Sequence, residues 1–247
     1  MRQVWTDNDH CTLDGTPFEF GRSGYATLQT TDEKVWVLKN KIFYDLYDRF
    51  LAGRTPSRIL EIGIFEGGSA MLFADKWPEA KIASLDIRPQ NDAVLRHLDR
   101  LGFADRVSLH YNVSQDDEEK VRAIIDRDLD GSPDMVIDDA SHLNHWTRKT
   151  FEIVFPRLAR GGLYIIEDWA WAHTEPFQAA DHPWQRWPAL SNLVFELSMM
   201  AASSPHLISE IYLMRSLVVV KKACGVMPDG FRLEDHYLAR GRKLNEI

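Results

Sequence analysis

The stretch from Arg58 to Ser69 restricts the fold more than any other part of the chain. It reads Arg-Ile-Leu-Glu-Ile-Gly-Ile-Phe-Glu-Gly-Gly-Ser. An apolar run ends at Gly63 and a helical pattern begins after Gly67 and Gly68, which predicts a buried strand, a glycine turn and a helix start. Glycine adopts positive φ and leaves no Cβ in the way, so a ligand can approach the backbone N–H groups. We therefore expect a nucleotide-like cofactor at this turn.

The residues around the turn narrow the kind of nucleotide. A dinucleotide fingerprint needs G-x-G-x-x-G, and a phosphate loop needs a lysine after its last glycine. Phe65 stands in place of the second glycine, and no lysine follows Gly68. The carboxylate of Glu61 would repel a pyrophosphate but attract an ammonium or sulfonium group. A dinucleotide oxidoreductase is therefore disfavoured.

The length of 247 residues suits one large α/β domain with an elaboration, or at most two small domains, and the apolar fraction of 45% is enough for a full core. The formal charge of −8 argues against binding to a nucleic-acid backbone, which needs a basic face. Only Cys11 and Cys224 are present, and the sequence has no signal core or membrane-length apolar run. We expect a soluble, cytoplasmic protein with reduced thiols, without nucleic-acid or membrane partners.

Strand-like and helical patterns alternate through the middle of the chain, which predicts βαβ units and a parallel sheet. The strands are predicted at 59–62, 81–86, 106–111, 135–138 and 163–167. The helices between them are predicted at 69–77, 91–101, 116–127 and 145–158. Ligands of such sheets bind beyond the carboxyl ends of the strands.

The two ends of the chain are less regular. Residues 1–31 lack periodicity and are interpreted as a lid or interface arm. Apolar residues from Val35 to Leu51 recur at helical spacing, which predicts an amphipathic helix capped by Thr31 or Asp32. We expect an N-terminal arm and helix at 1–52, a core at 53–224 and a peripheral tail at 225–247. A homo-oligomer is left open, with the arm as one candidate contact surface.

An aromatic segment follows the last parallel strand. Residues 168–188 contain four of the eight tryptophans, together with His173 and His182, to which the sequence assigns no role. A loop of this length is usually functional or disordered, and its aromatic content disfavours disorder. Some of these rings are candidates to line an acceptor pocket. A helix at 189–202 and two strand-like runs at 207–214 and 217–221, close enough for a hairpin, are predicted after it.

Acidic residues gather at two strand ends. Asp138, Asp139 and His142 follow one strand, and Glu167 and Asp168 follow the next. If these strands are neighbours, the carboxylates of Asp139, Glu167 and Asp168 converge and repel one another unless a cation lies between them. Oxygen ligands in this number suit Mg²⁺, with Mn²⁺ and Ca²⁺ as alternatives.

The motif Glu61-x-Gly63-x-x-x-Gly67, with Asp86 ending the next apolar run, resembles the class I S-adenosylmethionine-dependent methyltransferases. The resemblance implies a Rossmann-like fold, with a seven-stranded, mostly parallel sheet, one antiparallel strand and helices on both faces. It also places the carboxylate of Asp86 on the ribose hydroxyls. Ser69 is assigned to the same cofactor site. The plainer alternative is a tight turn between strand and helix, without a cofactor.

The blocks at 136–142 and 155–168 resemble a narrower group, the Mg²⁺-dependent macrolide-sugar O-methyltransferases and the cephalosporin hydroxylase-type proteins. This resemblance implies that Asp139, Glu167 and Asp168 bind metal. It implies that His142 is the catalytic base, with Asp139 beside it. Ser114 and Gln115 lie where the family contacts adenine, although Asn112 and Val113 depart from its usual wording.

Asp138 is also assigned to the cofactor site, with capping of the following turn as the alternative. The resemblance implies an S-adenosylmethionine- and Mg²⁺-dependent O-methyltransferase that acts on a hydroxyl of a sugar-bearing or polyhydroxylated natural product, as in antibiotic biosynthesis. Two other functions remain open. One is a non-methylating relative, of hydroxylase or cyclase type, that retains the cofactor pocket, and the other is a regulatory module without catalysis.

Overall fold

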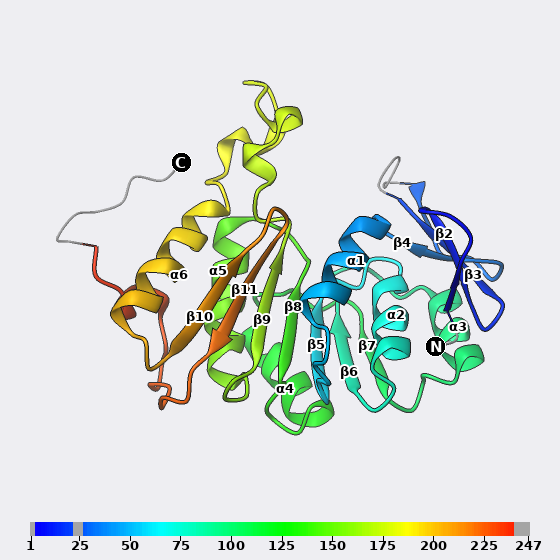
Figure 1. Cartoon of the computed structure of the whole chain (residues 1–247), viewed down its shortest axis with the longest axis horizontal. Coiled ribbons are helices and arrows are strands. Elements are labelled where there is room, and N and C mark those ends of the chain that lie inside the picture. Colours follow the sequence, from blue (N-terminus) through cyan, green and yellow to red (C-terminus); the bar gives the residue numbers. More distant parts are fainter. Residues whose placement is uncertain (1–2, 22–26, 240–247) are drawn as a thin grey trace. The chain divides into compact units, whose positions relative to one another are not determined.

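The computed structural model describes residues 3–21 and 27–239 (Figure 1). The described chain forms two compact units, Met1–Val113 and Ser114–Ile247. It contains a four-stranded sheet in the order β1-β2-β3-β4 and a seven-stranded sheet in the order β10-β11-β9-β8-β5-β6-β7. The larger sheet is mostly parallel and has the strand order of a class I methyltransferase, which confirms the predicted fold class.

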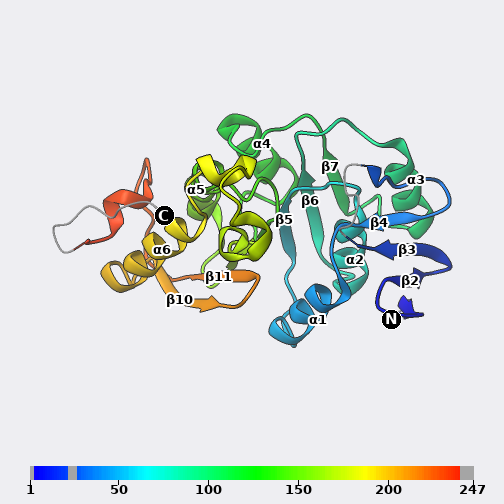
Figure 2. The ribbon, with the colours of Figure 1, turned by 90° about the horizontal axis from the view of Figure 1, so that it is seen from above.

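The first unit contributes three parallel strands, β5 (Arg58–Ile62), β6 (Lys81–Leu85) and β7 (Val107–His110). Helices α2 (Gly68–Lys76) and α3 (Asp92–Leu101) follow β5 and β6. Asn91 caps α3 by accepting a hydrogen bond from the Ala93 N–H, and Gly102 ends it with a φ of 74°. Figure 2 shows α1 and α2 on the same side of these strands.

The prediction that Val35 lies in an amphipathic helix was wrong, whereas the role of the N-terminal segment as a lid or interface arm stays a prediction. Strands within residues 3–20 and 35–37 form a four-stranded sheet. Its strands are β1 (Gln3–Trp5), β2 (His10–Leu13), β3 (Thr16–Phe20) and β4 (Val35–Val37). Asp14 and Gly15 both have positive φ and join β2 to β3, as in the two-residue Asp-Gly hairpin turn. Residues 1–2 and 22–26 of the predicted arm lie outside the described residues.

Helix α1 (Lys41–Phe50) begins later than predicted. Its cap is Asn40, whose side chain accepts from the Phe43 N–H at 2.9 Å, and not Thr31 or Asp32. Val35 and Val37 are buried in β4 instead. The apolar residues that were predicted to form one helix therefore belong to two elements, a short buried strand and a later helix.

The second unit contributes the other strands of the large sheet. They are β8 (Met135–Asp138), β9 (Leu163–Glu167), β10 (Ile208–Leu213) and β11 (Leu217–Lys222). Strand β11 runs antiparallel to β9 and pairs with β10 as a hairpin, as predicted. Helices α4 (Glu118–Asp128), α5 (Asn144–Val154) and α6 (Ser191–Ser203) contact one another in turn and lie behind these strands in Figure 1.

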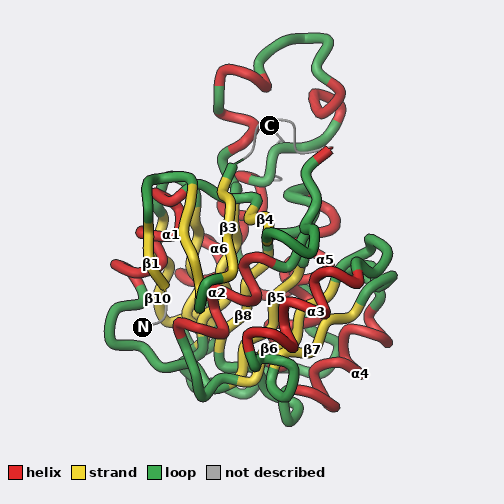
Figure 3. Tube along the Cα trace, turned by 90° about the vertical axis from the view of Figure 1, so that its right-hand side faces the viewer, coloured by secondary structure: helices red, strands yellow, loops and turns green. Residues whose placement is uncertain are grey.

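The aromatic segment after β9 is ordered through short helical turns. These turns are Trp171–His173, Glu175–Phe177 and Pro183–Arg186, and the segment projects beyond the end of β9 in Figures 1 and 3. Two further turns occur at Phe155–Arg157, where Pro156 follows α5, and at Leu233–His236. Within the described residues, no helix has the length and apolar character needed to cross a membrane.

The C-terminal segment is not peripheral in its described part. Phe231 and Leu233 are buried, and the Phe231 ring lies 6.1 Å from the Phe155 ring. Residues 240–247 of the predicted tail lie outside the described residues. The predicted single domain, with its core at 53–224, stays a prediction.

Gly68 is required by close packing of α2 on β4. A Cβ at this position would lie 2.5 Å from the Trp36 carbonyl oxygen and 2.6 Å from a methyl group of Val37. Gly68→Ala should therefore lower the free energy of unfolding by about 1–3 kcal/mol, despite the better helix propensity of alanine. Urea denaturation measures this change. Ser69→Ala, one residue further along α2, is the control and should be close to neutral, whereas equal stability of the two variants would contradict this packing.

Lys222 is a buried cation at the end of β11. Its Nζ donates to the carbonyl oxygens of Pro156 at 2.8 Å and Leu158 at 2.6 Å. Burial, with a smaller contribution from the charge of Arg160, lowers the pKa of Lys222 from 10.5 to about 8. Between these two pH values the unfolded chain binds more protons than the folded protein, so stability rises with pH.

We expect the wild type to gain on the order of 2 kcal/mol of stability relative to Lys222→Met as the pH rises from about 8 to 10.5. Urea denaturation at a series of pH values measures this difference. Lys221→Met is the control and should keep the rise of the wild type. A pH-independent difference between wild type and Lys222→Met would show that Lys222 does not titrate in this range.

Candidate functional site

The glycine turn after β5 is held by the carboxylate of Asp86 at the end of β6. Asp86 Oδ2 accepts hydrogen bonds from the backbone N–H groups of Ile64 and Phe65, both at 2.8 Å. Its other oxygen accepts from the Arg88 N–H at 2.8 Å. Phe65 has a φ of 48°, a conformation that costs a non-glycine residue free energy. Asp86 therefore stabilises the turn in addition to its predicted contact with ribose, which stays a prediction.

The residues predicted at the turn have different environments. Glu61 is 1% exposed and accepts a hydrogen bond from the Ser84 hydroxyl at 2.7 Å. Gly63 and Gly67 have positive φ, at 103° and 77°, as the turn requires. Ser69 is half-buried in the first turn of α2. The cofactor contacts of these four residues stay predictions.

Gly68 differs from the sequence interpretation. It was expected to leave room for a ligand, but the space that its Cβ would fill is occupied by Trp36 and Val37 of β4. Its role in this structure is close helix–strand packing. No sequence pattern near Gly68 identifies β4 as the neighbour.

Ile87 is a candidate cofactor residue that sequence analysis missed. It follows Asp86 directly and is 70% exposed, although it is a large apolar residue. Beside it, the guanidinium of Arg88 lies 4.4 Å from the centre of the Phe65 ring. An exposed apolar side chain next to Asp86, the carboxylate predicted to bind ribose, is suited to cover the flat base of a nucleotide. The signal in the sequence was an isoleucine immediately after the strand-end acid.

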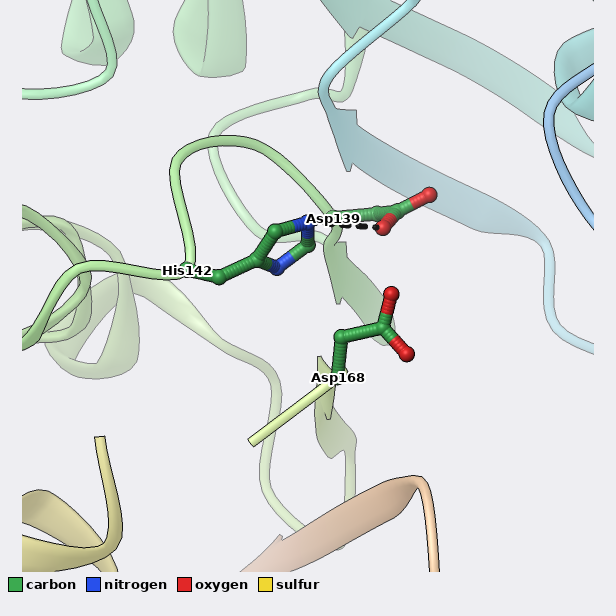
Figure 4. Close-up of side chains that lie close together, drawn as sticks. All are labelled: Asp139, His142 and Asp168. Carbon is green, nitrogen blue, oxygen red and sulfur yellow. Dashed lines mark ion pairs between the residues drawn. The ribbon is translucent and has the colours of Figure 1, made fainter. Parts of the chain in front are cut away.

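In the second unit, Asp139, His142 and Asp168 come together (Figure 4). Each offers one ligand atom, and these atoms all lie within 4.8 Å of one another. His142 Nε2 lies 3.6 Å from Asp139 Oδ1, the pair marked by the dashed line in Figure 4. We call these three residues the acidic cluster. Two carboxylates and an imidazole at this spacing can hold a divalent cation and leave positions for other ligands.

The backbone of the acidic cluster is strained. His142 and Asp168 have φ values of 55° and 51°, in the left-handed region. The Asp168 N–H donates to the Ser216 carbonyl oxygen at 2.8 Å, which fixes this conformation at the end of β9. Non-glycine residues in this region concentrate at functional sites, because the surrounding structure must offset their cost.

Glu167 is not part of this group. It is the last residue of β9 and is 0% exposed, opposite Leu217 of β11. Successive side chains of a strand point to opposite faces, so Glu167 and Asp168 need not face the same ligand. The metal-binding role of Glu167 stays a prediction, as do those of Asp139 and Asp168 and the basic role of His142.

Asp138 is buried at the end of β8, where its Oδ2 accepts a hydrogen bond from the Tyr164 hydroxyl at 2.8 Å. Burial raises the pKa of Asp138 to about 7, and the hydrogen bond from Tyr164 partly opposes this increase. The Ala140 N–H also interacts with this carboxylate, consistent with capping of the following turn. The contact of Asp138 with a cofactor stays a prediction.

Gln115 supports the loop that carries the acidic cluster. Its Nε2 donates to the Thr150 hydroxyl at 2.8 Å, and its Oε1 accepts from the Ser141 N–H at 3.2 Å. Ser114 donates to the carboxylate of Asp116. The two hydrogen bonds of Gln115 position the backbone between Asp139 and His142, a role that sequence analysis did not predict. The adenine contacts of Ser114 and Gln115 stay predictions.

Trp171 connects the aromatic segment to the acidic cluster through a hydrogen bond. This side chain is 9% exposed, and its Nε1 donates to the His142 carbonyl oxygen at 2.7 Å. The two histidines without a predicted role have structural partners. His182 accepts from the Trp184 N–H at 3.1 Å, and His173 Nε2 lies 2.8 Å from the Ser191 hydroxyl oxygen.

The central part of the chain matches a known protein family. Residues 60–169 match the methyltransferase domain family Methyltransf_24. The matched residues include the glycine turn, Asp86 and the whole acidic cluster, and most of the aromatic segment lies beyond them.

Two curated relatives are O-methyltransferases of antibiotic pathways. L-olivosyl-oleandolide 3-O-methyltransferase of Streptomyces antibioticus is 35% identical over 131 residues, which cover 49% of this chain and 31% of that protein. Mycinamicin VI 2''-O-methyltransferase of Micromonospora griseorubida is 35% identical over 118 residues, which cover 45% of this chain and 27% of that protein. The matched part thus spans about a third of these relatives.

Solved structures show the same fold. The methyltransferase MycE, in complex with Mg, S-adenosylhomocysteine (SAH) and mycinamycin VI, is 28% identical with a TM-score of 0.56, and the match covers 76% of this chain and 51% of that one. A putative caffeoyl-CoA O-methyltransferase from Staphylococcus aureus has a TM-score of 0.59 at 18% identity, a likeness of fold alone.

Asp86→Ala should destabilise the protein by about 2 kcal/mol or more, because three backbone N–H groups lose a charged acceptor. Thermal and urea unfolding without any ligand measure this effect, so it does not depend on the cofactor assignment. The matched control is Asp99→Ala on the exposed side of α3. If both variants unfold like the wild type, Asp86 does not hold the turn.

Proposed function

We propose that this chain is an S-adenosylmethionine- and Mg²⁺-dependent O-methyltransferase that acts on a hydroxyl of a sugar-bearing natural product. The observation that carries the proposal is the grouping of Asp139, His142 and Asp168 at the carboxyl ends of β8 and β9. Support comes from the relatives that methylate glycosides and from MycE, whose structure contains Mg and SAH.

The residues present fit both groups. For S-adenosylmethionine, the turn combines positive-φ glycines at a helix start with the carboxylates of Glu61 and Asp86, which suit a cation and ribose hydroxyls. Ile87 would cover the base. For Mg²⁺, Asp139 and Asp168 supply hard oxygen ligands. The imidazole of His142 completes the group or remains free to accept a proton.

The chemistry of the two groups is complementary. S-adenosylmethionine supplies an electrophilic methyl group, and a divalent cation supplies charge that lowers the pKa of an acceptor hydroxyl. Asp139 and Asp168 would position the cation. Gln115 holds the loop between Asp139 and the start of α5. His142 would remove the hydroxyl proton, because the unprotonated nitrogen of a neutral imidazole is an acceptor.

Trp171 helps His142 in this role. Its hydrogen bond to the His142 carbonyl oxygen fixes the strained backbone from which the imidazole projects. The imidazole then stays near Asp139, whose carboxylate lies 3.6 Å from Nε2. S-adenosylmethionine, held at the glycine turn, would supply the methyl group to the deprotonated acceptor oxygen and would leave as SAH.

Asp139→Asn and Asp168→Asn should each lower the rate of SAH formation by about a hundredfold or more, because each variant removes a charged ligand. The assay uses S-adenosylmethionine, Mg²⁺ and a rhamnosylated or olivosylated polyketide as acceptor. The affinity for S-adenosylmethionine and the melting temperature should not change. EDTA should abolish turnover and added Mg²⁺ should restore it.

Asp181→Asn is the matched control, because Asp181 is exposed on the aromatic segment. Full turnover after complete EDTA treatment would exclude the metal-dependent mechanism. Binding of S-adenosylmethionine without SAH formation from any glycoside would instead favour a non-methylating relative.

A further inference from the structure

Three aromatic rings form an exposed surface at the start of α5. The His145 ring lies 4.3 Å from the Trp146 ring and 5.1 Å from the Trp187 ring, and the two indoles are 6.5 Å apart. Trp146 is 37% exposed, His145 is exposed and Trp187 is half-buried. We call these three residues the aromatic platform. Large exposed rings of this kind are usual at binding sites rather than in solvent-facing helices.

The aromatic platform is preformed by the rest of the aromatic segment. The Trp187 N–H donates to the Trp184 carbonyl oxygen at 2.9 Å. The Trp184 ring packs edge-on against the Trp171 ring at 4.9 Å. Trp171 in turn donates a hydrogen bond to the His142 carbonyl oxygen. A ligand on the platform would therefore meet rings that are already ordered, which lowers the entropic cost of binding.

The platform follows the acidic cluster closely in the chain. Trp146 lies four residues after His142, and α5 begins between them at Asn144. The hydrogen bond from Trp171 to the His142 carbonyl oxygen connects the same loop to the aromatic segment that carries Trp187. The platform is therefore built on the loop and helix start that also carry His142.

The chemistry of the platform favours a sugar over other occupants. The faces of indole rings carry partial negative charge and attract the C–H groups on the apolar face of a pyranose. The imidazole of His145 offers hydrogen bonds to hydroxyl groups, and the Arg186 guanidinium lies 5.0 Å from the Trp187 ring at the rim. A protein partner would need about 800 Å², more than three partly buried rings provide.

We propose that the aromatic platform is a carbohydrate-stacking subsite, on which the sugar that bears the methylated hydroxyl lies against Trp146 and Trp187. The role of this sugar as acceptor rests on the proposed function, whereas its binding to the platform does not. The platform therefore determines specificity for a glycoside. Trp187 lies outside the residues that match the methyltransferase domain family, whereas His145 and Trp146 lie within them.

The test uses methyl α-L-rhamnopyranoside as probe, with saturation-transfer NMR and tryptophan fluorescence as readouts. The wild type should show saturable binding, with transfer to the ring C–H protons. Trp146→Leu and Trp187→Leu should each weaken binding by about tenfold or more. Trp146→Phe keeps a ring and should lose less affinity than Trp146→Leu, which separates stacking from a general loss of structure.

Phe195→Leu is the control, because Phe195 is an exposed aromatic residue on α6, 51% exposed and outside the platform. It should bind the probe like the wild type. Absence of saturable binding to the wild type up to the solubility limit of the probe would overturn the proposal. Equal binding by Trp146→Leu would also overturn it, as would selective binding of the flat probe 2-naphthol in place of the sugar.

Parallel measurements separate this proposal from the proposed function. Mn²⁺ affinity, followed by electron paramagnetic resonance, and S-adenosylmethionine affinity should stay within about twofold of the wild type in the platform variants. Platform-dependent sugar binding without SAH formation would leave the subsite intact and contradict methylation. Methylation of a glycoside with an unchanged KM in Trp146→Leu would contradict the subsite alone.

Discussion

Left-handed backbone at the strand ends is the constraint on which both candidate binding regions depend. Phe65, His142 and Asp168 have φ values between 48° and 55°, and each conformation costs on the order of 1–3 kcal/mol. Each is held by a specific contact. Asp86 accepts from the Phe65 N–H, Trp171 donates to the His142 carbonyl, and the Asp168 N–H donates to Ser216. The geometry of the reactive side chains thus follows from how the backbone is restrained.

These restraints differ in kind between the two units. At the glycine turn, a carboxylate that is expected to contact a ligand also holds the turn, so folding and binding use the same charge. At the acidic cluster, the supports are neutral groups, namely the amide of Gln115 and the indole of Trp171. The side chains of Asp139 and His142 lie close to one another, with Asp139 Oδ1 3.6 Å from His142 Nε2.

The sequence predicted those features that depend on local pattern. β8 and β9 were predicted with their observed bounds, because a continuous apolar run ending in an acid marks a buried parallel strand. The three-residue strand β4 was missed, since a helical period and a short strand cannot be separated when both are buried. The pair Asp14-Gly15 is a typical hairpin turn sequence, but the polar residues around it do not show the regular alternation that predicts strands.

The candidate site was predictable only in part for the same reason. That Asp139, His142 and Asp168 lie near one another follows from neighbouring strand ends. Glu167 is outside this group, and the adjacent sequence positions of Glu167 and Asp168 do not show it, because successive side chains of a strand point to opposite faces. The contacts of Gln115, Trp171 and Trp187 join residues 26 to 42 positions apart, and no local pattern encodes them.

The packing of Gly68 against Trp36 bears on where this fold begins. Residue 60 is the first residue that matches the methyltransferase domain family. The helix that starts in the glycine turn nevertheless packs on β4, a strand more than twenty residues earlier, at a distance that leaves no room for a methyl group. The N-terminal sheet therefore supports the helix that begins in the glycine turn, and a boundary drawn by similarity divides what the packing joins.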